Sequence, residues 1–214
     1  MWSTFKSCPH KFWREYIQHY KSKEPSVHLH AGASFASGVE AARRAFWDEG
    51  LPREDAVAIG LQALLEHYGS FECPQDSAKS AERTAGAFEF YMDQYPLGED
   101  GATPIKLATG KYGIELSFAE PLPEVLNPET GDPILFVGRL DQASNYADGV
   151  FIQDEKTTSS LGASWSKQWD LRSQFTGYAW GIMRSSGIKT NGVLVRGVSI
   201  LKTKYDTQQA ITYR

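Results

Sequence analysis

Apolar and polar residues in the first half of the chain recur with the period of a helix. Spacings of three and four residues between apolar positions put these positions on one face of each predicted helix. The predicted helices cover four ranges: 2–20, 31–49, 52–67 and 77–95. A polar connector at 21–30, which contains Pro25, follows the first helix, and a turn-rich linker at 96–103 follows the fourth. We therefore expect residues 1–100 to be mainly helical.

The second half of the chain changes to the pattern of strands. Alternating apolar positions and short apolar runs bounded by turn residues predict strands. The predicted strands cover four ranges: 111–119, 134–144, 149–157 and 191–200. A loop at 121–133 precedes the second strand, the second and third strands form a hairpin, and a helix at 164–186 precedes the last strand. We expect one α/β domain over 1–214, with a mixed β-sheet flanked by helices in 105–214.

Composition narrows the class of protein. Of the 214 residues, 41% are apolar and 13% are aromatic, which is enough to bury a sizeable core. The formal net charge of −4 argues against a protein that coats nucleic acid, but it leaves room for local basic patches. No signal peptide is recognisable, and no apolar run reaches the roughly 18–20 residues of a membrane span. We expect a soluble, cytoplasmic protein that does not contact a membrane.

Two acidic residues and a lysine stand where the strands of the predicted hairpin emerge from the core. Asp141 ends the run Gly-Arg-Leu-Asp at 138–141, and Asp154 follows thirteen residues later, enough for a turn and a return strand. Asp154 and Lys156 are two residues apart, so in a strand their side chains point to the same face. Two carboxylates that hold Mg²⁺ or Mn²⁺ beside a lysine are a set that can cleave a phosphodiester.

The residues of this set have separate expected roles. Asp141 and Asp154 are the candidate metal ligands. The side chain of Glu155 should point to the opposite face of its strand, so its backbone carbonyl is the candidate for a further ligand. Lys156 would orient or deprotonate the attacking water, or pair with the phosphate, because a lysine beside a cation can have a lowered pKa.

A solvated surface is the alternative interpretation of the Asp-Glu-Lys run at 154–156. Such runs are common on exposed strand faces. Two observations favour a site. Apolar stretches at 134–137 and 150–152 precede the two acids, and further motifs occur in order around them.

Five short motifs follow one another along the chain. They are SCPHKF at 7–12, GASFASGVE at 32–40, GRLD at 138–141, DEKT at 154–157 and QFTGY at 174–178. This order resembles the PD-(D/E)XK nuclease superfamily, specifically its RecB-like exonuclease branch. The resemblance covers nearly the whole chain, and its most specific part is the pairing of Gly-Arg-x-Asp with Asp-x-Lys-Thr.

The resemblance implies a restriction-endonuclease-like core that cleaves DNA with a divalent metal, with Asp141, Asp154 and Lys156 at its centre. It also implies that Gln174 and Tyr178 line the site, since they are four residues apart on one helix face. The alternative for these two is that Tyr178 packs the helix on the sheet while Gln174 is solvated.

Two positions depart from the pattern of the branch. Its histidine, often a metal ligand, is replaced by Ala36. Glu40 stands one helical turn later and is predicted to supply an acidic metal ligand instead. The alternative is that Glu40 is an ordinary exposed glutamate of the helix. Some relatives carry four cysteines for an iron–sulfur cluster, whereas this chain has Cys8 and Cys73 alone. We therefore expect no cluster, and we expect Cys8 to be a packed helix residue.

The predicted function is a Mg²⁺- or Mn²⁺-dependent deoxyribonuclease, more specifically an exonuclease in DNA repair, recombination or phage DNA processing. Its expected partners are DNA and a helicase or recombination protein. Two alternatives stay open. One is a DNA-binding or assembly module on the same fold, because the histidine is lost, and the other is a structure-specific endonuclease.

Overall fold

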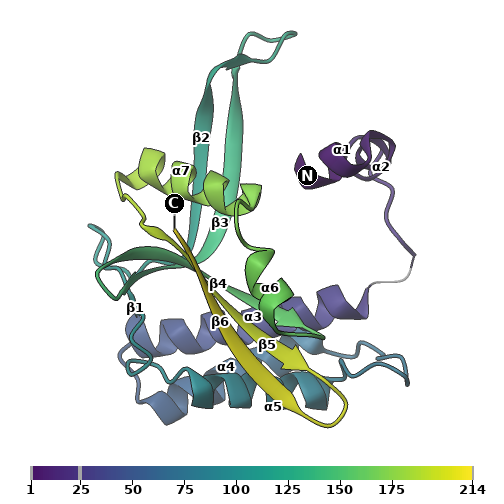
Figure 1. Ribbon diagram of the computed structural model, residues 1–214, viewed down its shortest axis with the longest axis vertical. Helices are drawn as coiled ribbons and strands as arrows, with labels where there is room; N and C mark the ends of the chain where they lie inside the picture. Colours follow the sequence, from purple (N-terminus) through teal and green to yellow (C-terminus); the bar gives the residue numbers. More distant parts are fainter. Residues whose placement is uncertain (1, 24–25, 214) are drawn as a thin grey trace.

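Helices form a layer on one side of the molecule, as the computed structural model of the chain shows (Figure 1). The structure describes residues 2–23 and 26–213. The layer consists of three long helices, α3 (Val27–Trp47), α4 (Arg53–Tyr68) and α5 (Ala81–Gln94). Three short segments precede it: α1 (Trp2–Ser7), α2 (Pro9–Phe12) and the π-helix η1 (Trp13–Ile17). Two helices, α6 (Ala163–Lys167) and α7 (Ser173–Ser186), lie within the sheet-forming half of the chain.

Within the described residues, six strands form one mixed sheet. They are β1 (Thr103–Pro104), β2 (Ile114–Leu126), β3 (Pro133–Tyr146), β4 (Gly149–Thr158), β5 (Gly192–Ile200) and β6 (Tyr205–Tyr213). The strand order is β1-β3-β4-β5-β6, and β2 also pairs with β3. Strands β4 and β5 are parallel and are connected through α6 and α7, whereas the other pairs are antiparallel. The predicted α/β class, with a mixed sheet flanked by helices, is confirmed.

Helices α3, α4 and α5 pack closely against one another and against the end of β5. Phe35, Leu64 and Phe88 are fully buried in the apolar cluster that joins these elements. Helices α3 and α4 can approach because of two glycines: a Cβ atom on Gly60 would lie 2.7 Å from the carbonyl oxygen of Gly38. In the part of the chain that the structure describes, no helix is both long enough and apolar enough to cross a membrane.

A second apolar cluster joins the sheet to α6 and α7. Trp165 of α6 and Phe175 of α7 are buried against Ile152 and Val195 of the central parallel strands. Helix α7 lies close to β2, because a Cβ atom on Gly181 would fall 2.2 Å from the ring of Phe118. Residues of α7 are thereby brought to the strands that carry the predicted site.

The helical half differs from the sequence prediction near the N-terminus. The predicted helix 2–20 is broken after Ser7, because Pro9 has no backbone N–H to continue it. Pro9 instead starts α2, and the Sγ atom of Cys8 caps this helix by accepting from the Lys11 N–H at 3.4 Å. The predicted connector 21–30 is shorter, since α3 already begins at Val27.

Two further helices have different limits from those predicted. The helix predicted for 77–95 begins only at Ala81, where it is capped by Ser80, whose side chain accepts from the Arg83 N–H. The predicted helix 164–186 is divided into α6 and α7 because Leu171 between them has a φ of 55°, which a helix cannot accommodate. Pro25 of the predicted connector lies outside the described residues.

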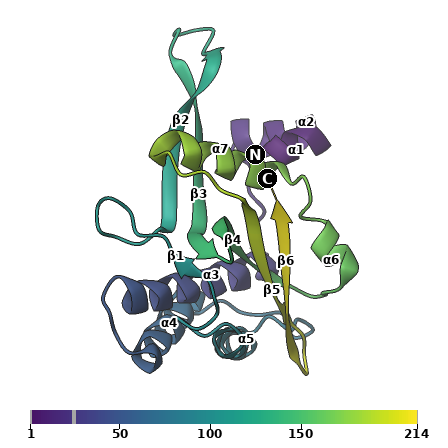
Figure 2. The same cartoon turned by 60° about the vertical axis from the view of Figure 1, so that its left-hand side comes forward.

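The strands are longer than the sequence predicted, and one was missed. The predicted loop 121–133 is mostly strand, so β2 and β3 form a long hairpin that projects from the sheet (Figure 2). Pro121 suggested a loop, but β2 pairs with β3 alone, and proline is tolerated on an edge strand. Strand β6 was not predicted, because its polar residues at 206–209 hide the alternating pattern.

Candidate active site

Strands β3 and β4 separate next to Asp141. Their pairing runs from the hairpin turn to Gln142 and Gln153, and beyond this pair β3 continues with β2. Asp141 is the first residue of β3 past this fork. Its Oδ2 atom accepts a hydrogen bond from the backbone N–H of Glu155 at 3.1 Å. The fork therefore holds a carboxylate of β3 against the segment of β4 that carries the predicted Asp-Glu-Lys run.

Asp154 and Lys156 form an ion pair on β4, as expected for residues on one strand face. The contact joins Oδ2 of Asp154 to Nζ of Lys156, and the side chain of Asp154 is 1% exposed. Burial raises the pKa of Asp154 to about 7, against the effect of the Lys156 ammonium and with a further rise from Asp141. Burial and the Glu155 carboxylate also raise the pKa of Asp141. Asp141, Asp154 and Lys156 thus lie within one electrostatic cluster.

Lys156 is held in its charged form in this cluster. Burial lowers the pKa of Lys156, but the carboxylates of Asp154 and Asp141 outweigh this effect, so the pKa is raised above its ordinary value. The neighbouring carboxylates therefore favour the ammonium form of Lys156. An ammonium can pair with a phosphate or orient water, and the deprotonation of water by Lys156 stays a prediction.

Glu155 points away from this cluster and into a buried polar network. The guanidinium of Arg43 on α3 donates to both carboxylate oxygens, at 2.9 and 2.5 Å. Tyr91 and Gln153 donate two more hydrogen bonds, at 3.0 and 2.7 Å. Burial alone would raise the pKa of Glu155, but Arg43 and the hydrogen bonds hold it at about 2. The Glu155 side chain lies on the strand face opposite to Asp154 and Lys156, as the strand period predicted, and ligation by its carbonyl stays a prediction.

Helix α7 brings Gln174 and Tyr178 to the same region. The amide of Gln174 donates to the Tyr178 hydroxyl at 3.1 Å, so the two side chains meet on one helix face. The ring of Tyr178 lies 6.4 Å from that of Phe118 and 6.5 Å from that of Phe175. Burial raises the pKa of Tyr178, to which Asp154 also contributes, so the hydroxyl is within electrostatic reach of the site.

Glu40 lies on the side of α3 that faces Asp141. A small cavity is lined by Ala36, Val39, Glu40, Arg43, Glu115, Asp141 and Glu155. Glu40 and Ala36 share it because they are one turn apart. The carboxylate of Glu40 accepts from Nε of Arg44 at 2.9 Å and is one-third exposed. The predicted approach of Glu40 to the site is consistent with this placement, and its metal ligation stays a prediction.

Glu115 is a site residue that the sequence analysis missed. It stands opposite Asp141, since the register pairs Ile114 with Gln142 and Leu116 with Leu140. Burial raises the pKa of Glu115 to about 7, and Asp141 raises it further while Arg139 opposes the rise. Arg139 forms an ion pair with it at 2.8 Å. The sequence shows a lone acid between Ile114 and Leu116, and the strand register is needed to place it beside Asp141.

Arg43 was also missed, although the sequence contains a signal for it. It follows Val39 by four residues and therefore stands on the apolar stripe of its helix. A charged residue on a buried stripe requires a buried partner. That partner is Glu155, which is 112 residues away in the chain.

The donor groups at the fork fit a divalent metal that keeps several waters. In the described ranges, no three His, Cys, Asp or Glu side chains gather into a metal cage. Mg²⁺ is commonly held by one or two carboxylates plus water and substrate oxygens. Asp141 and Asp154 supply two such groups, and the Asp154 carboxylate is already paired with the Lys156 ammonium. Glu115 and Glu40 add carboxylates close to Asp141.

The cysteines have local roles. Cys8 is exposed at the start of α2, so the predicted packing of this residue in a helix is wrong. The reason is Pro9, which ends the preceding helix and turns Cys8 into a cap. Cys73 donates weakly to the carbonyl oxygen of Pro74 at 3.5 Å. Both are free thiols.

No protein-family model matches the chain, and none of the curated proteins matches it. Among solved structures, the chain is similar to the one titled "Crystal structure of SSO0001", with 15% sequence identity and a TM-score of 0.31. The match covers 96% of this chain and 76% of that chain. A likeness this distant does not bear on fold or function.

Proposed function

We propose that this protein is a divalent-metal-dependent deoxyribonuclease with a restriction-endonuclease-like core of the RecB-like type. The observation that carries the proposal is the fork between β3 and β4. There the Asp141 carboxylate binds the backbone of Glu155 beside the ion pair of Asp154 and Lys156. A buried carboxylate, Asp154, and a half-buried one, Asp141, both with raised pKa values and next to an ammonium, are typical of a catalytic site.

The residues would divide the work as follows. Asp141 and Asp154 would hold Mg²⁺ or Mn²⁺, which when bound neutralises phosphate charge and makes water nucleophilic. Lys156 would hold a positive charge beside the phosphate. Gln174 fixes the Tyr178 hydroxyl, which can then orient the substrate from α7. The network of Arg43 and Glu155 keeps the backbone of β4 rigid under the site.

We propose an exonuclease that works on DNA in the cytoplasm with a helicase or recombination protein, in repair, recombination or phage DNA processing. A second candidate is a DNA-binding or assembly module without catalysis. It is favoured by Ala36 in the histidine position and by the ion pair that occupies Glu40. A structure-specific endonuclease is the third candidate.

The experiment that separates these candidates is incubation of end-labelled linear and circular DNA with Mg²⁺, Mn²⁺ or EDTA. Loss of linear DNA alone, in a metal-dependent manner, indicates an exonuclease. Cleavage of circular or branched DNA indicates an endonuclease. Binding without degradation under every metal condition indicates the non-catalytic module and overturns the proposal.

A further inference from the structure

Lys79 is a buried cation that the candidate site does not use. It precedes α5 and is 3% exposed. Its Nζ donates to the backbone carbonyl of Thr158 at 3.2 Å. Over residues 2–23 and 26–213, no carboxylate forms an ion pair with it within 4.0 Å. A buried ammonium with one neutral partner is costly, because buried charges are normally paired.

A cavity of about 350 Å³ adjoins Lys79. Its polar lining residues are His28, Asp76, Ser77, Lys79 and Ser159. Ser77 also accepts the backbone N–H of Lys79 at 3.1 Å, which forms the turn that carries the lysine. Ammonium, hydroxyl and imidazole groups are the donors that bind a phosphate. Asp76 is the one acid of this lining.

The cavity lies where strands β4 and β5 end together. Ser159 and Leu201, which follow these two parallel strands, both line it. Ligands of open α/β sheets bind outside the carboxyl ends of parallel strands. Thr158 is also two residues beyond Lys156 on β4, a separation of about 7 Å along the strand.

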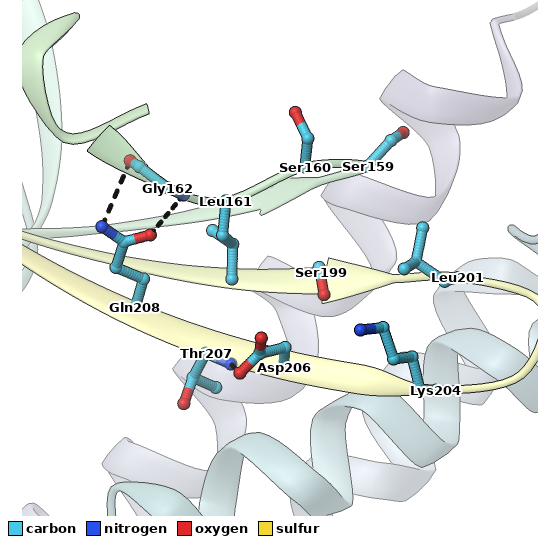
Figure 3. A pocket seen from close by; sticks show the side chains of 10 residues that line it. All are labelled: Ser159, Ser160, Leu161, Gly162, Ser199, Leu201, Lys204, Asp206, Thr207 and Gln208. Atoms are coloured by element: carbon cyan, nitrogen blue, oxygen red, sulfur yellow. Dashed lines mark hydrogen bonds between the residues drawn. The ribbon is translucent and has the colours of Figure 1, made fainter. Parts of the chain in front are cut away.

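A neighbouring cavity is also lined by Ser159 and Leu201, but its polar groups do not indicate a missing ligand. It is the cavity shown in Figure 3, where Gln208 bonds to both the N–H and the carbonyl of Gly162, at 2.6 and 3.2 Å. Its charged residues, Lys204 and Asp206, have opposite signs and are not buried. Of these two cavities, the Lys79 cavity alone is lined by a buried, unpaired cation.

We propose that the Lys79 cavity binds a phosphate group, and that this group is a backbone phosphate of the DNA strand being cut. The choice of DNA as the source rests on the proposed nuclease function, whereas the phosphate site itself does not. Burial lowers the pKa of Lys79 to about 8, so Lys79 is still protonated in most molecules at neutral pH. A bound phosphate would supply the negatively charged partner that Lys79 lacks within the protein.

Thermal unfolding in inorganic phosphate tests the site without any need for catalysis. A ligand that binds the folded state raises the Tm. Phosphate, compared with chloride at equal ionic strength, should raise the Tm of the wild type and of Lys189→Met, an exposed lysine at the other end of the sheet. It should leave the Tm of Lys79→Met unchanged. An equal shift in all three proteins, or no shift in any, overturns the site.

Two variants keep this test informative. Lys79→Met should fold, because an apolar side chain of similar length replaces an unpaired buried charge. Asp76→Asn removes the one acid of the lining and should increase the shift caused by phosphate. A smaller shift in Asp76→Asn would contradict the proposed role of the cavity.

DNA binding in EDTA identifies the source of the phosphate. Fluorescence anisotropy of a labelled oligonucleotide should show about tenfold weaker binding by Lys79→Met than by Lys189→Met, with a salt slope lower by about one. If Lys79→Met binds DNA as tightly as Lys189→Met but shows no Tm shift in phosphate, the site binds free phosphate and the DNA assignment is overturned. A wild type that shows the phosphate shift but never cleaves DNA would refute the nuclease function and leave the site intact.

Discussion

The carboxylate of Asp141 accepts a hydrogen bond from the backbone N–H of Glu155 at the point where their strands cease to pair. The bond spans the fork between β3 and β4, so a side-chain hydrogen bond stands where a backbone hydrogen bond between the two strands would otherwise continue their pairing. It fixes Asp141 relative to Asp154 and Lys156, which flank Glu155 in the sequence. The geometry of the candidate site therefore depends on this fork more than on any loop.

Asp154→Asn should abolish cleavage while leaving the fold intact. The substitution removes one negative ligand but keeps the size of the side chain, and we expect activity with Mg²⁺ to fall by at least about a hundredfold. The fold should be retained, because the amide keeps the size of the carboxylate in its buried position. The control is Asp148→Asn in the exposed hairpin turn. Degradation of DNA by Asp154→Asn at the wild-type rate would refute the mechanism.

Glu40→Gln should reduce cleavage about 10–100-fold, the range seen when groups that support a metal site are removed. The carboxylate lies on the cavity that Asp141 also lines, and oxygen ligands suit Mg²⁺. Ala36→His should leave activity similar or shift the metal preference toward Mn²⁺. Rates measured with both metals test this. Full activity of Glu40→Gln would show that the carboxylate does not compensate for the missing histidine.

Arg43→Leu should destabilise the protein by about 3–5 kcal/mol, because it leaves the buried Glu155 carboxylate without its cation. The neighbouring Arg44→Leu is the control. Arg44 is 38% exposed and its ion pair with Glu40 is a surface pair, so a loss below about 1 kcal/mol is expected. Denaturant unfolding gives both values. Similar losses in the two variants would contradict a structural role for the Arg43–Glu155 pair.

The stability advantage of Lys79→Met over the wild type should shrink as the pH rises from about 8 toward 10.5. The pKa of Lys79 is lowered from 10.5 to about 8 in the folded protein. Between these values the unfolded chain binds more protons than the folded chain, so the free energy of unfolding of the wild type rises with pH. Below pH 8 the full cost of the buried charge is present. Unfolding curves in phosphate-free buffer test this, and a difference independent of pH would disprove it.

The sequence by itself determined the local relationships of the site. The two-residue period of a strand placed Asp154 and Lys156 on one face and Glu155 on the other, and the structure agrees. The helical period placed Gln174 beside Tyr178 in the same way. These relationships depend on backbone geometry over a few residues, which the residue spacing alone specifies.

The tertiary structure decided what surrounds these residues. Glu115 reaches Asp141 through the register of β2 on β3, and Arg43 reaches Glu155 through the packing of α3 on the sheet. The projecting hairpin and the unpaired charge of Lys79 likewise arise from strand pairing and from the meeting of distant segments. No local period encodes such contacts, because they depend on which of many registers and packings buries the most apolar surface and satisfies the buried polar groups.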